Sequence, residues 1–171
     1  MLSGPKTRRG LRGLLRITQN LRTPNMTEEL KAKVLLVDDE VDFLETLAER
    51  LEARGLKVST ATSGEDAVAD VDREGYDLIV LDLSMPGIDG LETLKRIKTK
   101  QPDAEIIILT GQGSIRTSIE AMKLGAEDFL QKPVDISELM DKISEAKDKR
   151  MLVLESKSIQ EIEKILKTKG W

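Results

Sequence analysis

The chain has 171 residues, 27 basic and 31 acidic side chains, a formal net charge of −4 at pH 7, and neither cysteine nor histidine. These absences exclude disulfides, thiol nucleophiles, zinc-cysteine sites and every catalytic, metal-binding or phosphoryl-carrying role of histidine. Only four aromatic residues are present, which argues against a nucleic-acid surface built on base stacking. No stretch approaches the ~20 consecutive apolar residues of a membrane span, so we expect a cytoplasmic protein.

The net charge conceals three different regions. Residues 1–25 hold six basic side chains and no acidic one, residues 26–150 carry a net −11, and residues 151–171 a net +1. Direct binding to nucleic acid is not expected, because the phosphates would be repelled by the acidic body.

Short apolar runs alternate with helical patterns from Lys33 onward. The runs cover residues 34–37, 56–61, 77–83, 105–110 and 127–131. Three of them are apolar at successive positions, which is typical of parallel strands covered on both faces. Helical spacing of apolar residues lies between and after them, at residues 41–51, 67–71, 91–97, 115–122 and 136–143. Five strands alternating with five helices predict a doubly wound α/β sheet, with its site beyond the carboxyl ends of the strands.

Polar residues follow four of these runs. Asp38 and Asp39 end the first, Asp82 ends the third, Thr110 ends the fourth, and Lys132 follows the fifth. Clustered carboxylates raise one another's pKa unless a cation compensates, and oxygen ligands without histidine or cysteine suit Mg²⁺. A carboxylate nucleophile, a divalent metal and a lysine together fit phosphoryl transfer onto aspartate.

Each of these residues also has an ordinary structural interpretation. An aspartate after a strand is commonly a turn or helix cap, and a threonine at a strand end commonly reflects strand propensity. Their occurrence at the same ends of four α/β units favours the functional interpretation. Further along, we interpret Asp89 as a helix cap.

Four segments carry a family resemblance, namely VLLVDDE, LIVLDLSMPGIDGLE, IIILTGQGS and AMKLGAEDFLQKP. Together they resemble the receiver domain of bacterial two-component response regulators, and are similar to nitrogen-regulator-type and chemotaxis-type receivers. The resemblance covers residues 32–149. It implies a flavodoxin-like, doubly wound, five-stranded parallel sheet in the order 2-1-3-4-5 with five helices.

The resemblance also implies roles for the residues at the strand ends. Asp82 would accept a phosphoryl group from a sensor histidine kinase or a phosphotransfer protein. Mg²⁺ would be held by Asp38, Asp39 and Asp82, with Asp39 the closer of the first two, and by the backbone carbonyl of Ser84. Lys132 would pair with the phosphoryl group. The protein would catalyse only its own phosphorylation and dephosphorylation, and would not otherwise be an enzyme.

Two further residues would form the switch in this family. The Thr110 hydroxyl would move inward to hydrogen-bond the phosphoryl group, and Phe129 would change rotamer with it. The Lys132–Pro133 peptide bond would be cis. The loop before the third helix would make a tight turn, with Pro86, Gly87 and Gly90 supplying its special backbone dihedral angles.

Three alternatives concern the same site. A haloacid-dehalogenase-type phosphatase needs a second aspartate two residues after its nucleophile, where this chain has Ser84. A flavodoxin-type flavin carrier needs a phosphate-binding loop after the first strand, where this chain has Asp38 and Asp39. The third alternative is a receiver that has lost phosphorylation, although all the expected residues are present.

The two ends of the chain are less specific. Residues 1–31 are expected to form a disordered basic extension. We attribute its residues 1–25 to an upstream start without function, with a targeting or membrane-surface segment as the alternative explanation. Residues 150–171 have a helical apolar pattern. They could extend the fifth helix and fold back on the body, form a dimerisation or partner helix, or fray.

The output follows from the length that remains. Only 22 residues follow Lys149, too few for a winged helix or an ATPase domain. We therefore expect a stand-alone receiver that acts on an unknown downstream protein target. The alternatives are a homodimer that its C-terminal helix forms upon phosphorylation, and a phosphorelay intermediate.

Overall fold

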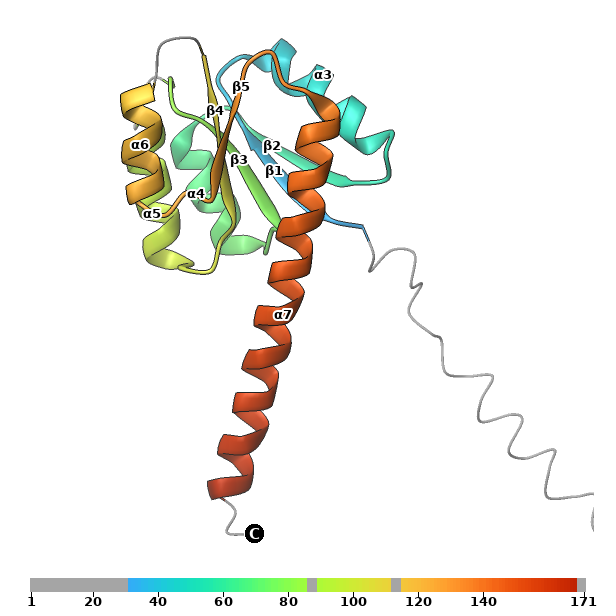
Figure 1. Cartoon of the computed structure of the whole chain (residues 1–171), viewed down its shortest axis with the longest axis vertical. Coiled ribbons are helices and arrows are strands. Elements are labelled where there is room, and N and C mark those ends of the chain that lie inside the picture. Colours follow the sequence, from blue (N-terminus) through green and yellow to red (C-terminus); the bar gives the residue numbers. More distant parts are fainter. Residues whose placement is uncertain (1–30, 86–88, 112–114, 169–171) are drawn as a thin grey trace, which may run out of the picture. The chain divides into compact units, whose positions relative to one another are not determined.

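A computed structural model describes residues 31–85, 89–111 and 115–168 of the chain (Figure 1). The predicted basic extension, apart from its last residue, and the predicted turn residues Pro86 and Gly87 lie outside the described residues. The contacts within the chain separate residues 32–171 as one compact unit, and the description below concerns that unit.

A five-stranded parallel sheet forms its centre. The strands are β1 (Lys33–Val37), β2 (Lys57–Ala61), β3 (Leu78–Asp82), β4 (Ile106–Thr110) and β5 (Asp128–Gln131). Their order is β2-β1-β3-β4-β5, which confirms the predicted topology. β3 and β4 are buried along their whole length, because their apolar side chains face helices on both sides of the sheet.

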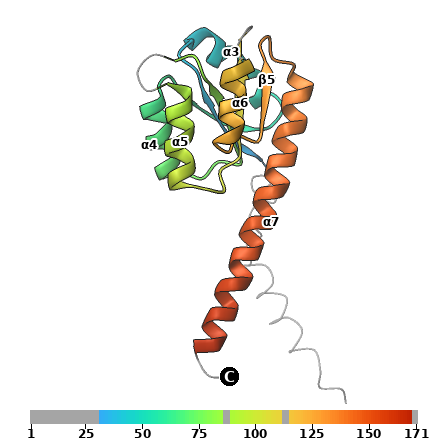
Figure 2. The same cartoon turned by 60° about the vertical axis from the view of Figure 1, so that its left-hand side comes forward.

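Five helices cover the two faces of the sheet (Figure 2). They are α3 (Val41–Glu52), α4 (Gly64–Arg73), α5 (Gly90–Lys100), α6 (Ile115–Lys123) and α7 (Ile136–Thr168). One core cluster joins the sheet to α4, α5 and α6, and a second joins it to α3 and α7. Alternate residues of each strand serve the two clusters, since successive side chains point to opposite faces. Leu35 and Val37 belong to the first, and Val34 and Leu36 to the second.

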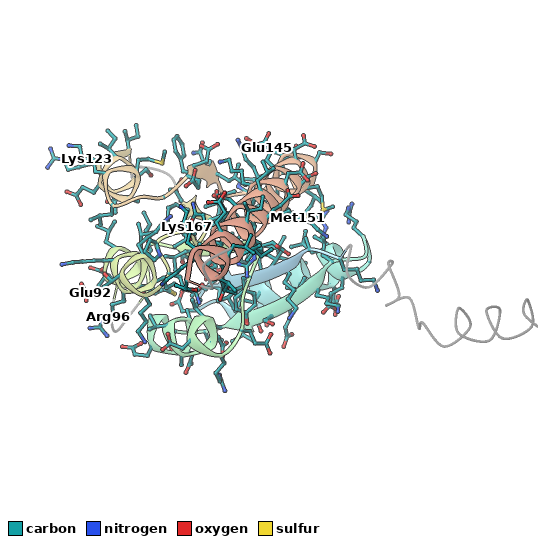
Figure 3. The ribbon with its side chains drawn as sticks, turned by 90° about the horizontal axis from the view of Figure 1, so that it is seen from below. Glu92, Arg96, Lys123, Glu145, Met151 and Lys167 are labelled. Carbon is teal, nitrogen blue, oxygen red and sulfur yellow. The ribbon has the colours of Figure 1, made fainter. Side chains whose placement is uncertain are left out.

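Local signals in the sequence explain where several helices begin. The Ser63 hydroxyl accepts a hydrogen bond from the Asp66 amide at 3.1 Å and begins α4. The Asp89 carboxylate accepts one from the Glu92 amide at 2.8 Å and begins α5, so the predicted cap is confirmed. Along α5, Glu92 pairs with Arg96 one turn later at 2.8 Å (Figure 3).

Gly90 is needed for a different reason from the one predicted. It is the first residue of α5, and among the described glycines only Gly55 and Gly125 have positive φ. The proposed special dihedral angle at Gly90 is therefore wrong. A Cβ atom there would overlap the Leu83 Cα and lie 2.6 Å from the Asp82 carbonyl oxygen. Glycine thus allows α5 to start directly against the end of β3.

Helix α7 is much longer than its predicted core pattern. It runs unbroken for 33 residues, across the expected domain boundary at 149/150, and buries Ile136, Leu139, Ile143 and Ala146. Beyond Arg150 every described side chain is exposed except that of Val153, which is half-buried. The helix therefore extends as one alternative predicted, but it does not fold back on the body. No helix in the described part of the chain combines the length and apolar character needed to cross a membrane.

Replacing Gly90 with alanine is expected to destabilise the fold by about 1–3 kcal/mol, because the new methyl group meets backbone atoms that cannot move aside easily. The matched control is Gly111→Ala, since a Cβ at Gly111 meets nothing within 4 Å and should change stability by no more than about 0.5 kcal/mol. Urea unfolding of both variants measures the difference, and equal stabilities would contradict this explanation of Gly90.

Candidate functional site

Three carboxylates meet at the carboxyl ends of β1 and β3. These strands are neighbours, with Val37 opposite Leu81, so the residues that follow each strand reach the same edge of the sheet. Carboxylate oxygens of Asp38, Asp39 and Asp82 lie within 4.8 Å of one another. Asp38 is 0% exposed and Asp82 5% exposed, whereas Asp39 faces solvent. The predicted acidic cluster is thus present.

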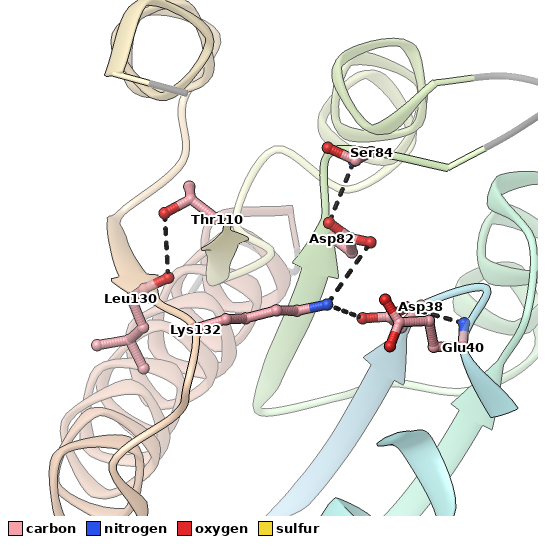
Figure 4. A network of polar contacts seen from close by, with 7 residues as sticks. All are labelled: Asp38, Glu40, Asp82, Ser84, Thr110, Leu130 and Lys132. Carbon is pink, nitrogen blue, oxygen red and sulfur yellow. Dashed lines mark hydrogen bonds and ion pairs between the residues drawn. The ribbon is translucent and has the colours of Figure 1, made fainter. Parts of the chain in front are cut away.

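Lys132 supplies positive charge to this cluster. It follows β5, and its ammonium nitrogen lies 2.6 Å from Asp38 Oδ2 and 3.9 Å from Asp82 Oδ2 (Figure 4). The Lys132–Pro133 bond is cis, as predicted. On another side, the ring of Phe43 in α3 lies 4.4 Å from the same nitrogen, which adds a cation–π attraction.

Backbone amides hold both buried aspartates. The Glu40 N–H donates to Asp38 Oδ1 at 2.9 Å, and the Ser84 N–H donates to Asp82 Oδ1 at 3.1 Å (Figure 4). Each carboxylate is therefore fixed by the amide two residues after it, which leaves its Oδ2 atom on the side of Lys132. Charge-assisted bonds of this kind orient a carboxylate before any ligand arrives.

The electrostatics of the site leave Asp82 in need of a cation. Burial raises the pKa of Asp82, and the negative charges of Asp38 and Asp39 add to this, against the lowering effects of the Ser84 amide and Lys132. Burial alone would lower the pKa of Lys132, but its hydrogen bond to Asp38 and the attraction of Asp82 raise it overall. The lysine therefore stays charged while the Asp82 anion remains unfavourable.

The donor set fits Mg²⁺. The three carboxylates offer only oxygen atoms, Asp39 is open to solvent, and a hard cation that keeps several waters needs few protein ligands. The described contact of Ser84 with the cluster is its N–H bond to Asp82, so the role of its carbonyl as a ligand stays a prediction.

Thr110 and Phe129 line the same cavity. Thr110 ends β4, is buried, and directs its hydroxyl to the Leu130 carbonyl at a long 3.5 Å (Figure 4). Phe129 lies on β5 and is 50% exposed. A cavity of about 300 Å³ between β5 and α6 is lined by both residues, and also by Ile119 and Met122. The structure therefore joins the two predicted switch residues, while the inward movement of Thr110 stays a prediction.

Phe43 is a site residue that the sequence pattern does not identify. The core-facing pattern of its helix runs through Leu44, Leu47 and Leu51, and Phe43 lies outside it. The sequence signal that could have identified Phe43 is a large apolar residue outside the core pattern, four positions after Asp39. The partnership between Lys132 and Asp38 is not predicted either, because the sequence assigns the lysine only to the incoming phosphoryl group.

Comparison with known families gives one consistent result. The response regulator receiver domain family matches residues 34–144. The transcriptional regulatory protein ZraR of Salmonella typhimurium is 40% identical over 116 residues, which are 68% of this chain and 26% of that protein. The C4-dicarboxylate transport transcriptional regulatory protein DctD of Pseudomonas aeruginosa is 33% identical over 132 residues, 77% of this chain and 29% of that protein.

Solved structures agree with the sequence relatives. A response regulator receiver domain protein from Clostridium thermocellum superposes with a TM-score of 0.68 at 35% identity, covering 71% of this chain and 98% of that chain. NtrX from Brucella abortus gives a TM-score of 0.69 at 31% identity, covering 76% of this chain and 30% of that chain. The chain spans less than a third of the length of the curated relatives it matches.

The raised pKa of Asp82 predicts a pH-dependent gain on removing its charge. Because the folded-state pKa lies above the unfolded one, ionised Asp82 weakens folding at neutral pH, and this cost disappears as pH falls through the folded-state pKa. Asp82→Asn, without metal, should therefore raise the urea midpoint at pH 7 and lose this advantage in acid. Asp39→Asn is the control, with a smaller expected gain because Asp39 is exposed. A lower urea midpoint for Asp82→Asn than for the wild-type protein at pH 7 would contradict the raised pKa of Asp82.

Proposed function

The chain belongs to the response regulator receiver family, and on that premise we propose that it accepts a phosphoryl group on Asp82 from a sensor histidine kinase or a phosphotransfer protein. The observation that supports this most directly is the cluster of Asp38, Asp39 and Asp82 beside the Lys132 ammonium. The reaction is confined to the protein's own aspartate.

The residues divide the work of transfer. An oxygen of Asp82 forms a bond to phosphorus while the phosphorus–nitrogen bond of the donor breaks and the electron pair returns to the donor's imidazole. The Ser84 amide already holds the carboxylate in one orientation, which lowers the entropic part of the barrier. Lys132, facing Asp82, stabilises the negative charge on the phosphoryl oxygens.

We assign Mg²⁺ to Asp38, Asp39 and Asp82, with the Ser84 carbonyl as the remaining protein ligand. Bound Mg²⁺ supplies the positive charge that lets an anionic phosphoryl group approach a net-negative pocket. Asp38 is suited to hold the ion because its other oxygen is anchored by the Glu40 amide. Asp39 is suited because it is open to solvent.

The negative charge of a phosphoryl group on Asp82 would change the surface near α6 through Lys132, Thr110 and Phe129. A phosphoryl group on Asp82 competes with Asp38 for Lys132 and attracts the Thr110 hydroxyl, whose present bond at 3.5 Å is weak. Inward movement of Thr110 makes room for the Phe129 ring in the neighbouring cavity. The exposed apolar residues of α6, Ile115 and Ile119, then border a changed surface, which we propose binds the downstream protein target.

The output of the chain stays a prediction. ZraR and DctD are named as transcriptional regulators, and this chain matches only their receiver-sized portion. Action without a DNA-binding domain, the cytoplasmic location and the phosphorelay alternative are therefore predictions as well. A receiver that has lost phosphorylation is the competing interpretation, and phosphorylation of the purified protein distinguishes the two.

Incubation with acetyl phosphate and Mg²⁺ should add one phosphoryl group, measured by the intact mass of the protein. Asp82→Asn should abolish this addition, because the attacking oxygen becomes part of an amide. The control is Asp89→Asn, since Asp89 caps α5 and its replacement keeps an oxygen acceptor for the Glu92 amide. Unmodified wild-type protein, or equal addition to Asp82→Asn, would contradict the proposal.

Mg²⁺ alone should raise the thermal unfolding temperature of the wild-type protein, because an ion that binds only the folded state stabilises it by RT ln(1 + c/Kd), where c is the free Mg²⁺ concentration. Asp39→Asn should weaken the apparent Mg²⁺ affinity at least tenfold, by the loss of one charged ligand. Asp66→Asn serves as a control on the exposed start of α4. The assignment fails if the two variants respond to Mg²⁺ alike.

A further inference from the structure

The last five turns of α7 expose an apolar stripe that no described residue covers. Six of its side chains are 48–66% exposed, namely Met151, Leu152, Ile159, Ile162, Ile165 and Leu166. With 3.6 residues per turn, these positions lie on one side of the helix. We call these six residues the α7 stripe. The stripe is about 24 Å long. It is therefore a contiguous apolar surface, unlike the single, scattered apolar side chains that are normal on the surface of a monomer.

The body anchors the opposite side of this helix. Lys149 pairs with Glu127 at 3.2 Å, and Lys157 pairs with Asp103. Between them, Arg150 pairs with Asp77 at 3.6 Å and donates a hydrogen bond to the Tyr76 carbonyl oxygen. Each of these contacts joins α7 to a part of the chain that is distant in sequence. Val153, between the anchors, is half-buried. In the end-on view of Figure 3, Met151 and Lys167 lie on different sides of α7.

Gly75 leaves space for the Arg150 side chain against the body. A Cβ atom at Gly75 would overlap the Arg150 guanidinium, so the glycine leaves the space that the arginine occupies. Because the anchors turn Arg150 and Lys157 toward the body, the α7 stripe faces away from it. The protein's own body therefore does not supply the cover.

The stripe also begins where the body ends. On the same helix face, the earlier turns carry polar residues, among them Asp141, Ser144 and Asp148. From Met151 onward the face becomes apolar. This change is expected if a second macromolecule covers the helix only beyond the body.

The spacing of the apolar residues and the balanced charge of residues 151–168 favour a second copy of the chain as the molecule that binds the α7 stripe. Leu152, Ile159 and Leu166 are seven residues apart, with Ile162 between the last two, which is the pattern of a helix that packs lengthwise on another helix. Residues 151–168 carry three lysines and three glutamates, so two copies of this segment do not repel each other as two acidic bodies would. The stripes of two copies would bury on the order of 1,000 Å² in total, at the low end for a specific interface.

We infer that residues 151–168 of α7 pair with the same segment of a second copy, and that the homodimer forms whether or not Asp82 is phosphorylated. The stripe is exposed in the unmodified protein and starts more than four helical turns after Ile136, so its availability does not depend on the acidic site. Glu155 lies on the same face of α7 as the stripe. It places a charge in the dimer interface and therefore weakens the association. The inference does not rest on the proposed function.

Sedimentation equilibrium of the whole chain, from low to high micromolar concentration, tests this inference. The wild-type protein should shift from the 19.0 kDa monomer toward twice that mass, with and without beryllofluoride and Mg²⁺. Ile159→Asp should weaken association at least tenfold, because a carboxylate would be placed in the dimer interface. The matched control, Gln160→Asp, puts the same group outside the α7 stripe, about 100° around the helix from Ile159, and should leave association unchanged. Glu155→Leu should strengthen it several-fold.

Three results would overturn the inference. They are a monomer throughout the concentration range, equal association of Ile159→Asp and Gln160→Asp, and a dimer that forms only with beryllofluoride. Circular dichroism of both aspartate variants confirms that α7 remains helical, so that loss of association is not loss of the helix.

Discussion

The site depends on one ammonium group placed between two buried carboxylates. Without the charge of Lys132, Asp38 and Asp82 would repel each other in a place that water barely reaches. The lysine comes from the end of β5, the edge strand, whereas Asp82 ends the central strand β3. A change at Asp82 therefore reaches the edge of the sheet directly, where Phe129 lies and from which the chain leads into α7.

Helix α7 combines two different roles along its length. Its first turns complete the core through Leu139 and Ile143, and its last turns present apolar side chains to solvent. The ion pairs of Arg150 and Lys157 separate these parts and fix the direction of the exposed one. Surface ion pairs are individually weak, but these two and the Lys149–Glu127 pair, within nine residues of the helix, together restrict its rotation about its axis. The proposed phosphorylation site and the proposed dimer interface thus lie at opposite ends of one domain.

The sequence predicted the sheet and the acidic cluster because both follow from local patterns. Successive apolar residues identify covered parallel strands, and neighbouring parallel strands bring Asp38 and Asp82 to one edge. It could not predict the Lys132–Asp38 pair or the bond of Thr110 to Leu130, since both depend on side-chain orientation after folding. The requirement for Gly90 depends on how closely α5 approaches β3. Whether the end of α7 folds back depends on ion pairs to residues distant in sequence.

The central claim is that Asp82, and neither of its acidic neighbours, carries the phosphoryl group. Borohydride reduces an aspartyl phosphate to homoserine but leaves free aspartate unchanged, so the modified position can be read by peptide mass spectrometry. After treatment with acetyl phosphate and Mg²⁺, we expect homoserine at position 82 alone. Homoserine at position 38 or 39, with position 82 unmodified, would contradict the claim.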